Sequence, residues 1–414
     1  MIEYNEHTLE NGLRIIHHQE KNSPIAVVNL LYDVGSKDEH PEKTGFAHLF
    51  EHLMFGGSKN IPSYDTPLQE VGGENNAFTS TDITNYYISL PVNAIETAFW
   101  LESDRMNELA FTPKSLEVQK KVVVEEFKQN YLNQPYGDVY LLMKPLAFKE
   151  HSYKWATIGK KVEHIEEAEM EDVKDFFYRF YRPNNAILCV VGDIDFDKLI
   201  DLSNKWFGQI PKGVELTRNL TVEPAQNSGR ELSVEREVPQ DAIYMAFHMC
   251  ARTHQDYQAT DLISDILSSG ESSRFFKELV LGNQMFSELN AFITGEIDPG
   301  LFMIGGKLTP GVSMKEAEQA IWEQLKRISS QLVAEDELIK SKNKILTIDA
   351  YGKTSALNKA MGLAYAALLG DIDLINSEKE RYLEVSRQDI LRVSKSLFHE
   401  TNCSTLYYNK IADE

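Results

Sequence analysis

Five consecutive residues, His48-Leu49-Phe50-Glu51-His52, combine two imidazoles and a carboxylate at a spacing that suits metal chemistry. On a helix, positions i, i+3 and i+4 share one face, so His48 and His52 can bind one metal ion while Glu51 reaches a water molecule beside it. Zinc accepts neutral imidazoles in tetrahedral geometry, and a neighbouring carboxylate can take a proton from the water. The pattern predicts a zinc hydrolase site with Glu51 as the general base.

A chain with eleven histidines and many acidic residues could contain this pattern by chance. The flanking residues argue against chance, because Ala47 and residues 53–55 are apolar and Gly56-Gly57 provides a helix stop. Three polar side chains on an apolar helix would cost several kcal/mol if they were buried without partners. A bound metal ion would satisfy all three together.

A third ligand is expected, since two histidines and one carboxylate form a common catalytic zinc set. Thr112-Pro113 has the residue types of an N-cap and a first helical position, and predicts a helix that extends through Phe127. Projected at about 100° per residue, Glu126 lies at the margin of the apolar face, and Glu125 lies nearly opposite that face. We therefore expect Glu126 to be the ligand and Glu125 to be a solvated surface carboxylate.

With these residues in place, the chain resembles the inverted-motif zinc peptidases, which include pitrilysin, insulin-degrading enzyme and the mitochondrial processing peptidase. In that family His-x-x-Glu-His is followed by a ligand Glu some seventy residues later, and His48, Glu51, His52 and Glu126 match it residue for residue. The resemblance covers essentially the whole chain and is closest to the zinc-bearing subunit of a bacterial heterodimeric member. It implies one zinc ion per chain. Further matching segments are residues 9–13, 72–73, 76–79, 181–183 and 191–193.

One position departs from the family pattern. Many members carry an additional acidic residue a turn or two before the ligand Glu, where this chain has Gln119. We therefore expect Gln119 to supply no supporting carboxylate, with Glu117 as the substitute.

The second half of the chain repeats the pattern of the first. Residues 241–247 resemble residues 24–30, and residues 259–267 resemble the stretch that begins at Ala47. The repeat lacks the ligands, because Asp261, Ser264 and Asp265 stand where His48, Glu51 and His52 would be. Only the first half is therefore expected to hold zinc.

This duplication predicts an α+β fold of two homologous sandwich-like units, each a mostly antiparallel sheet backed by helices. Residues 1–213 would form the zinc-binding domain and residues 230–414 the homologous domain without ligands, joined by a linker at residues 214–229 that contains Pro224 and Asn227-Ser228-Gly229. The resemblance implies that the two units form half of a clamshell.

The resemblance also shows that two hydrogen-bond donors of the family are absent at the aligned positions. Active members, or the partners that complete them, carry an Arg and, seven residues later, a Tyr that stabilise the reacting carbonyl; the aligned residues here are Val280 and Ser287. Losing one such donor can cost about 10²- to 10³-fold in rate. We expect a homologous zinc-less subunit to supply both groups in a heterodimer with a closed chamber. Arg274 is a fallback donor, although a structural salt bridge is the simpler expectation for it.

Substrate binding is expected at Asn76, Ala77, Phe78 and Thr79, which follow a Gly-rich turn and have the pattern of a strand near the metal. An exposed strand edge can bind an extended peptide as an additional strand, and the matching family segment does so. The alternative is an ordinary sheet strand.

Composition narrows the functional class. A formal net charge of −21 argues against nucleic acid as a partner, and no apolar run is long enough to span a membrane. The first residues do not have the pattern of a signal peptide, and the three scattered cysteines suit reduced thiols, so a cytoplasmic location is expected. Peptides are the expected substrates of a zinc metalloendopeptidase. Two alternatives stay open: a non-catalytic core or scaffold subunit, and a self-sufficient homodimeric peptidase.

Overall fold

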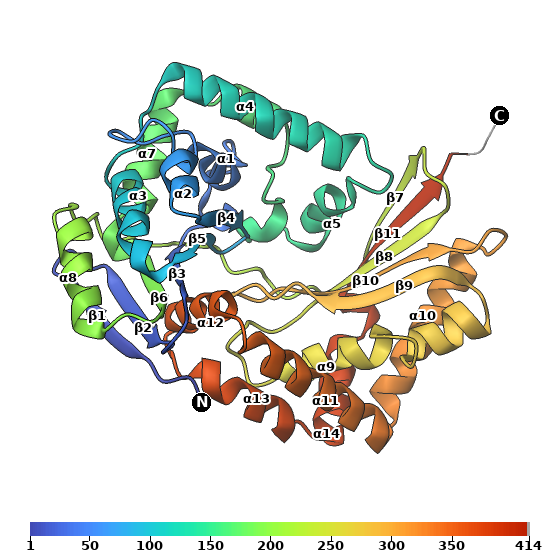
Figure 1. Ribbon diagram of the computed structural model, residues 1–414. Coiled ribbons are helices and arrows are strands. Elements are labelled where there is room, and N and C mark those ends of the chain that lie inside the picture. The colour runs from blue at the N-terminus through green and yellow to red at the C-terminus, as the bar shows by residue number, and fades with distance from the viewer. Residues whose placement is uncertain (412–414) are drawn as a thin grey trace. The chain divides into compact units, whose positions relative to one another are not determined.

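The computed structural model describes residues 1–411, which form two sheets and the helices that cover them (Figure 1). The first sheet contains β1 (Asn5–Thr8), β2 (Arg14–Gln19), β3 (Ile25–Tyr32), β4 (Glu74–Thr79), β5 (Thr84–Pro91) and β6 (Ala186–Gly192). The second sheet contains β7 (Arg230–Arg236), β8 (Ala242–His248), β9 (Phe286–Ile293), β10 (Leu301–Leu308) and β11 (Cys403–Lys410).

The two sheets share one topology. Their strand orders are β1-β2-β6-β3-β5-β4 and β7-β11-β8-β10-β9, so the second repeats the first without an equivalent of β1. In each sheet one pair is parallel, β2 with β6 and β7 with β11, and the other pairs are antiparallel. The predicted fold class, two homologous α+β units with mostly antiparallel sheets, is confirmed.

The chain folds into two compact units, each built from segments that are not contiguous in sequence. The first consists of residues 1–129, 155–220 and 350–377, and the second of residues 130–154, 221–349 and 378 onward. These units differ from the contiguous ranges 1–213 and 230–414 expected from the sequence, because residues 130–154 and 350–377 each belong with the other half of the chain. Residues 412–414 of the expected second domain lie outside the described part.

The helices follow this division. Those of the first unit are α1 (Phe46–Leu53), α2 (Asp65–Glu70), α3 (Ile95–Asn107), α4 (Pro113–Phe127), α6 (Glu163–Glu166), α7 (Met170–Phe180), α8 (Phe196–Phe207) and α12 (Ala356–Leu368). Those of the second are α5 (Val139–Ala147), α9 (Tyr257–Ser268), α10 (Met314–Ser330) and α14 (Arg387–Leu397). Two helices cross a division point, α11 (Glu335–Gly352) and α13 (Leu374–Glu384).

Short 3₁₀ and π segments join these elements. The 3₁₀ segments are η1 (Ser36–Asp38), η2 (Val92–Ala94), η4 (Ser152–Lys154), η5 (Pro183–Asn185) and η7 (Glu400–Asn402), and the π segments are η3 (Lys128–Leu132) and η6 (Phe276–Gly282).

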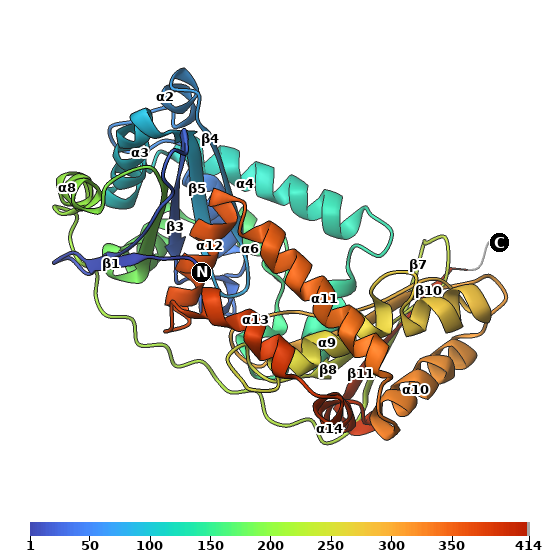
Figure 2. The same ribbon diagram turned by 60° about the horizontal axis from the view of Figure 1, so that its bottom comes forward.

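Helix α12 completes the core of the first unit, although it lies far along the chain from the strands. Its residues Ala360, Leu363, Ala364 and Ala367 are buried in one hydrophobic cluster with residues of β2, β3 and β6. Figure 2 shows α12 beside the strands of the first sheet. Small alanine side chains let the helix approach the sheet closely, so α12 covers an apolar face that would otherwise be exposed to water.

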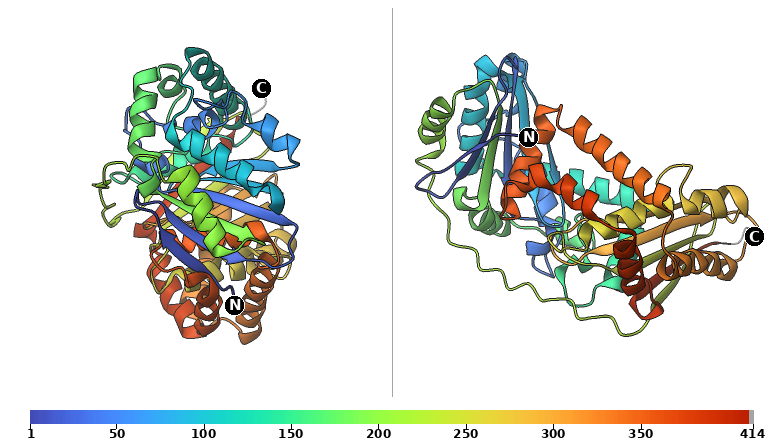
Figure 3. Two further views of the ribbon diagram at one scale, coloured as in Figure 1. Left: turned by 60° about the vertical axis from the view of Figure 1, so that its left-hand side comes forward. Right: turned by 90° about the horizontal axis from the view of Figure 1, so that it is seen from below.

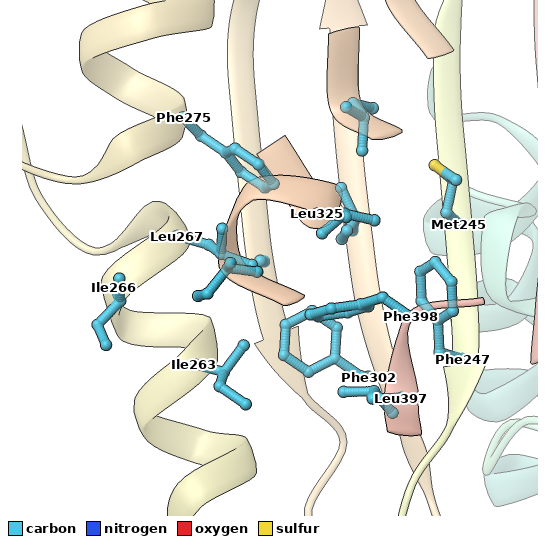
Figure 4. Packing of buried hydrophobic residues seen from close by; sticks show 14 of the residues in the cluster. Met245, Phe247, Ile263, Ile266, Leu267, Phe275, Phe302, Leu325, Leu397 and Phe398 are labelled. Carbon is cyan, nitrogen blue, oxygen red and sulfur yellow. The ribbon is translucent and has the colours of Figure 1, made fainter. Parts of the chain in front are cut away.

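The second sheet is covered on both faces. Helices α9, α10 and α14 enclose the larger cluster, in which Phe398 packs edge-on against Phe247 and Phe302 (Figure 4). Helix α5, from the first half of the chain, packs Val139 and Met143 in a separate cluster with residues of β8, β10 and β11. The second unit therefore depends on a segment that precedes its own strands in the sequence.

The segment between α8 and β7 has no regular structure over residues 211–229, and Figure 3 shows it as an irregular trace. Ion pairs and hydrogen bonds hold parts of it. Arg218 binds the carboxylates of Asp33 and Asp38, both at 2.6 Å. Glu223 accepts hydrogen bonds from three consecutive backbone amides at residues 149–151.

Candidate metal centre

Helix α1 carries the three polar residues of the motif on an otherwise buried element. It begins after Gly45, whose φ of +88° is unfavourable for other residues and whose missing side chain leaves room for the carbonyl of Ile158. Phe50 stacks on Tyr181 with a ring-centroid separation of 5.2 Å. This packing fixes the rotation of the helix, so His48, Glu51 and His52 occupy its partly exposed face.

The buried carboxylate of Glu39 binds the backbone at the start of α1. Glu39 accepts hydrogen bonds of 2.9 Å from the backbone amides of Gly45 and Ala47. Burial raises the pKa of Glu39 to about 8, whereas the two hydrogen bonds oppose that rise. Glu39 was not predicted from the sequence, because no local capping pattern connects it with a helix that begins seven residues later.

Helix α4 supplies the third residue of the cluster, and it begins as the sequence predicted. The hydroxyl of Thr112 accepts a hydrogen bond from the backbone amide of Ser115, and Pro113 takes the first helical position. The side chain of Glu126 is 35% exposed and points toward the histidines, whereas that of Glu125 is 73% exposed and pairs with Lys128. The structure therefore places Glu126 beside the motif and Glu125 on the surface.

The nearby acidic alternative does not join the cluster. The side chain of Glu117 is 61% exposed and forms an ion pair with Lys120 at 3.4 Å. Gln119 is partly buried and carries no charge. The departure from the family pattern at Gln119 is therefore not offset by Glu117.

The nitrogen and oxygen atoms of the cluster lie at separations that suit one small metal ion. The Nε2 atoms of His48 and His52 are 3.4 Å apart, and Glu126 Oε2 lies 3.7 Å from His48 Nε2 and 3.5 Å from His52 Nε2. Zinc–ligand bonds of about 2.0–2.1 Å in tetrahedral geometry place ligand atoms roughly 3.3 Å apart. Among residues 1–411, these three form the only group of potential metal ligands.

The protonation states of the cluster also suit a metal ion. Burial lowers the pKa of His48 to about 4, so its imidazole is neutral at pH 7. A hydrogen bond with His52 lowers the pKa of Glu126, which favours the carboxylate. Neutral imidazole and ionised carboxylate are the forms that bind zinc.

Glu51 contacts the strand that was expected to bind substrate. The hydroxyl of Thr79 donates a hydrogen bond of 2.6 Å to Glu51 Oε2. Burial raises the pKa of Glu51, and the hydrogen bond from Thr79 acts in the opposite direction. The sequence pattern placed Thr79 among the substrate contacts, and this link with Glu51 was not predicted.

Strand β4 contains the whole predicted substrate segment and is an edge strand. Among the described strands it pairs with β5 alone, and the backbone amide of Ala77 donates a hydrogen bond of 2.8 Å to the side chain of Asn76. Asn76 is exposed, while Ala77, Phe78 and Thr79 are partly buried. The strand contacts α1, the helix of the motif. The expected strand near the candidate metal centre is thus present.

The second unit contains no equivalent of the missing carbonyl donors at the two predicted positions. Val280, in η6, packs against the hydrophobic core, and Ser287 is an exposed residue at the start of β9. Arg274 forms a two-pronged ion pair with Glu337, with both hydrogen bonds at 2.8 Å. This is the structural salt bridge expected for Arg274.

The duplicated α+β fold, with one potential metal centre in its first unit, defines the class of protein. Comparison with known families agrees with it: the model described as insulinase (peptidase family M16) matches residues 14–154, and the model described as peptidase M16 inactive domain matches residues 168–345. The chain belongs to the M16 family of peptidases.

Similar proteins span nearly the whole chain. A relative from Helicobacter pylori named zinc protease PqqE is 29% identical over 97% of this chain and 91% of its own length. The mitochondrial-processing peptidase subunit beta of Dictyostelium discoideum is 24% identical over 98% of this chain and 88% of its own. The crystal structure of a protease from Helicobacter pylori has a TM-score of 0.94, with 26% identity over 99% of this chain and 100% of that one.

Within residues 1–411, none of the helices has the length and apolar composition needed to cross a membrane. The expected cytoplasmic location stays a prediction.

Proposed function

We propose that this chain is the zinc-bearing subunit of a metalloendopeptidase that cleaves peptides or unfolded segments. The observation that carries the proposal is the cluster of His48, His52 and Glu126, whose ligand atoms lie 3.4–3.7 Å apart with Glu51 one turn of α1 away. The zinc protease names of relatives support the choice of metal.

In this proposal His48, His52 and Glu126 hold one zinc ion. Zinc supplies Lewis-acid chemistry, which polarises the scissile carbonyl and makes water a stronger acid. Glu51 acts as general base toward the attacking water and then returns the proton to the leaving amine. Its position between the two histidines on α1 keeps its carboxylate near the reacting atoms without making it a ligand.

The peptide substrate is proposed to bind along β4 as an additional strand. The edge of β4 that has no partner among the described strands would offer backbone hydrogen bonds that do not depend on substrate sequence, with a peptide replacing the Asn76 side chain at the amide of Ala77. Asn76, Ala77, Phe78 and Thr79 belong to this strand. Backbone recognition of this kind requires an extended substrate, which favours flexible peptides over folded proteins.

The carbonyl donors are proposed to come from a homologous zinc-less subunit. Val280 and Ser287 cannot donate to a developing oxyanion as Arg and Tyr would, and Arg274 is engaged by Glu337. The name of the Dictyostelium relative, a subunit of a processing peptidase, supports an assembly of more than one chain. A closed chamber between two such subunits would exclude water and folded proteins.

The test combines zinc analysis with peptide cleavage, each performed with the chain alone and in a mixture with any homologous zinc-less chain that a search of the source genome finds. The proposal expects one zinc ion per chain, little cleavage by the chain alone and strong cleavage by the mixture. Glu51→Gln should retain zinc and lose about 10²- to 10⁴-fold in kcat. Zinc without cleavage in the mixture would favour a scaffold subunit, and full activity of the chain alone would favour a self-sufficient homodimer.

A further inference from the structure

Thr79 differs from the other residues of the substrate segment in what its side chain contacts. Successive side chains of a strand point to opposite faces of the sheet, and Phe78 packs against the cluster that contains α12. Thr79 therefore lies on the opposite face, where its hydroxyl donates to Glu51 Oε2 at 2.6 Å. This short hydrogen bond links the end of β4 with the middle of α1.

The carboxylate of Glu51 is held by two groups of one residue, the hydroxyl and the backbone amide of Thr79. Among the described residues, Thr79 is the one whose groups donate hydrogen bonds to the side chain of Glu51. A glutamate side chain has several rotatable bonds, whereas threonine is β-branched and has a restricted χ1. A stiff donor on a strand can thus select one orientation of the Glu51 carboxylate, with Oε2 engaged by the Thr79 hydroxyl.

We propose that Thr79 is a positioning residue for Glu51, which keeps the carboxylate in the orientation needed for proton transfer. The inference rests on the proposed function, in which Glu51 is the general base. Residues that orient metal ligands through hydrogen bonds contribute about 10- to 100-fold to metal affinity or activity, and we expect a similar factor for a residue that orients the general base. Thr79 acts through Glu51 and does not need to touch the substrate.

The position of Thr79 also connects substrate binding with the base. Thr79 is the last residue of β4, the edge strand on which a peptide would add. A peptide hydrogen-bonded to β4 would restrict the motion of this strand and hence of the hydroxyl that holds Glu51. Substrates that extend along more of β4 should therefore raise kcat as well as lower KM.

The decisive variants change the hydroxyl and keep the shape. Thr79→Val is isosteric but has no hydroxyl donor, and should lower kcat about 10- to 100-fold with zinc stoichiometry and KM retained. Thr79→Ser restores the donor and should recover most of the loss. In the Glu51→Gln background Thr79→Val should cause little additional loss, because both changes act on one group.

Thr84→Val is the matched control. Thr84 lies directly opposite Thr79 in the β4–β5 register, and its buried hydroxyl donates to the carbonyl of Val34 at 2.9 Å. This change should lower the melting temperature without lowering kcat of the folded, zinc-loaded enzyme. A loss of kcat equal to that of Thr79→Val would mean that any hydroxyl lost from this strand pair damages the site, and would overturn the proposal.

A structural readout separates this inference from the proposed function. Crystal structures of the wild type and Thr79→Val should show the Glu51 carboxylate in one orientation in the first and displaced in the second. An unmoved Glu51 in Thr79→Val, or an unchanged kcat, would overturn the role of Thr79. A wild type that binds no zinc or cleaves no peptide would instead overturn the proposed function. The orientation of Glu51 in the two crystal structures would still decide the role of Thr79.

Discussion

The hydroxyl of Tyr382 donates a hydrogen bond of 2.7 Å to the carboxylate of Asp261. Asp261 occupies the position in α9 that His48 occupies in α1. Four residues later Asp265 accepts a hydrogen bond of 2.9 Å from the ammonium group of Lys344. The second unit thus uses the former ligand positions for contacts between helices. These contacts stabilise the packing of the helices. The cluster in the first unit is the one group of potential metal ligands among the described residues.

Tyr382→Phe should destabilise the second unit and leave the metal site unchanged. The substitution removes the donor to a partly buried carboxylate, which should lower the free energy of unfolding by about 1–2 kcal/mol. Urea unfolding measures this loss, and zinc stoichiometry should not change. Tyr351→Phe, at a tyrosine that is 74% exposed, is the control and should alter neither quantity.

Glu126→Gln and Glu125→Gln should have different effects although the residues are neighbours. Glu126→Gln replaces the anionic ligand of the proposed site by a neutral amide and should weaken zinc binding strongly. Glu125→Gln changes an exposed residue on the other side of α4 and should bind zinc as the wild type does. Competition with a chromophoric chelator measures both affinities. Equal affinities of the two variants would contradict the assignment of Glu126.

Glu337→Gln should give a loss of stability that depends on pH. The hydrogen bond from Arg274 lowers the pKa of Glu337 below its usual value of about 4.3. The ion pair therefore stabilises the fold fully above about pH 4.3, and this contribution disappears as the pH falls through the lower pKa of the folded state. We expect a difference of about 1 kcal/mol at pH 7 that closes in acid.

Urea unfolding at several pH values tests this dependence, and Glu335→Gln serves as the control because it changes the same charge in the same helix. A constant difference between wild type and Glu337→Gln from about pH 7 to about pH 3 would show that the charge of Glu337 does not contribute.

Glu39→Gln should reveal the opposite pH dependence. Burial raises the pKa of Glu39 to about 8, so the folded state keeps a proton that the unfolded chain releases near a pH of about 4.3. The wild type should lose stability relative to Glu39→Gln as the pH rises between about 5 and 8, with a limiting slope of about 1.4 kcal/mol per pH unit. Thermal unfolding of both proteins across this range measures the effect. A wild type that gains stability over the same range would indicate that the two amide hydrogen bonds keep Glu39 ionised.

Local patterns predicted the helices that carry the cluster. The spacing within residues 48–52 has meaning only on a helix, and helical periodicity alone distinguished Glu126 from Glu125. The Thr112 cap was predicted for the same reason, since a cap and its amide partner lie within three residues. Duplication was visible because α1 and α9 occupy the same place between equivalent strands.

Contacts between distant segments could not be predicted in this way. Thr79 and Glu51 are 28 residues apart and meet only because β4 and α1 are packed together. Glu39 was missed because its acidic side chain is typical of a surface residue, whereas the structure buries it at the start of α1. The exchange of residues 130–154 and 350–377 was missed because apolar periodicity shows that a helix is buried and does not show which sheet buries it.

The contribution of α12 to the first sheet has a consequence for synthesis of the chain on the ribosome. All three proposed ligands have been synthesised once the chain reaches residue 126. The apolar face of the first sheet, however, stays uncovered until α12 has been added up to Ala367. The metal-bearing unit can therefore complete its fold only after most of the chain has emerged. A premature stop before α12 would release a product that contains every ligand and still exposes an apolar sheet face, which makes it a candidate for aggregation or degradation.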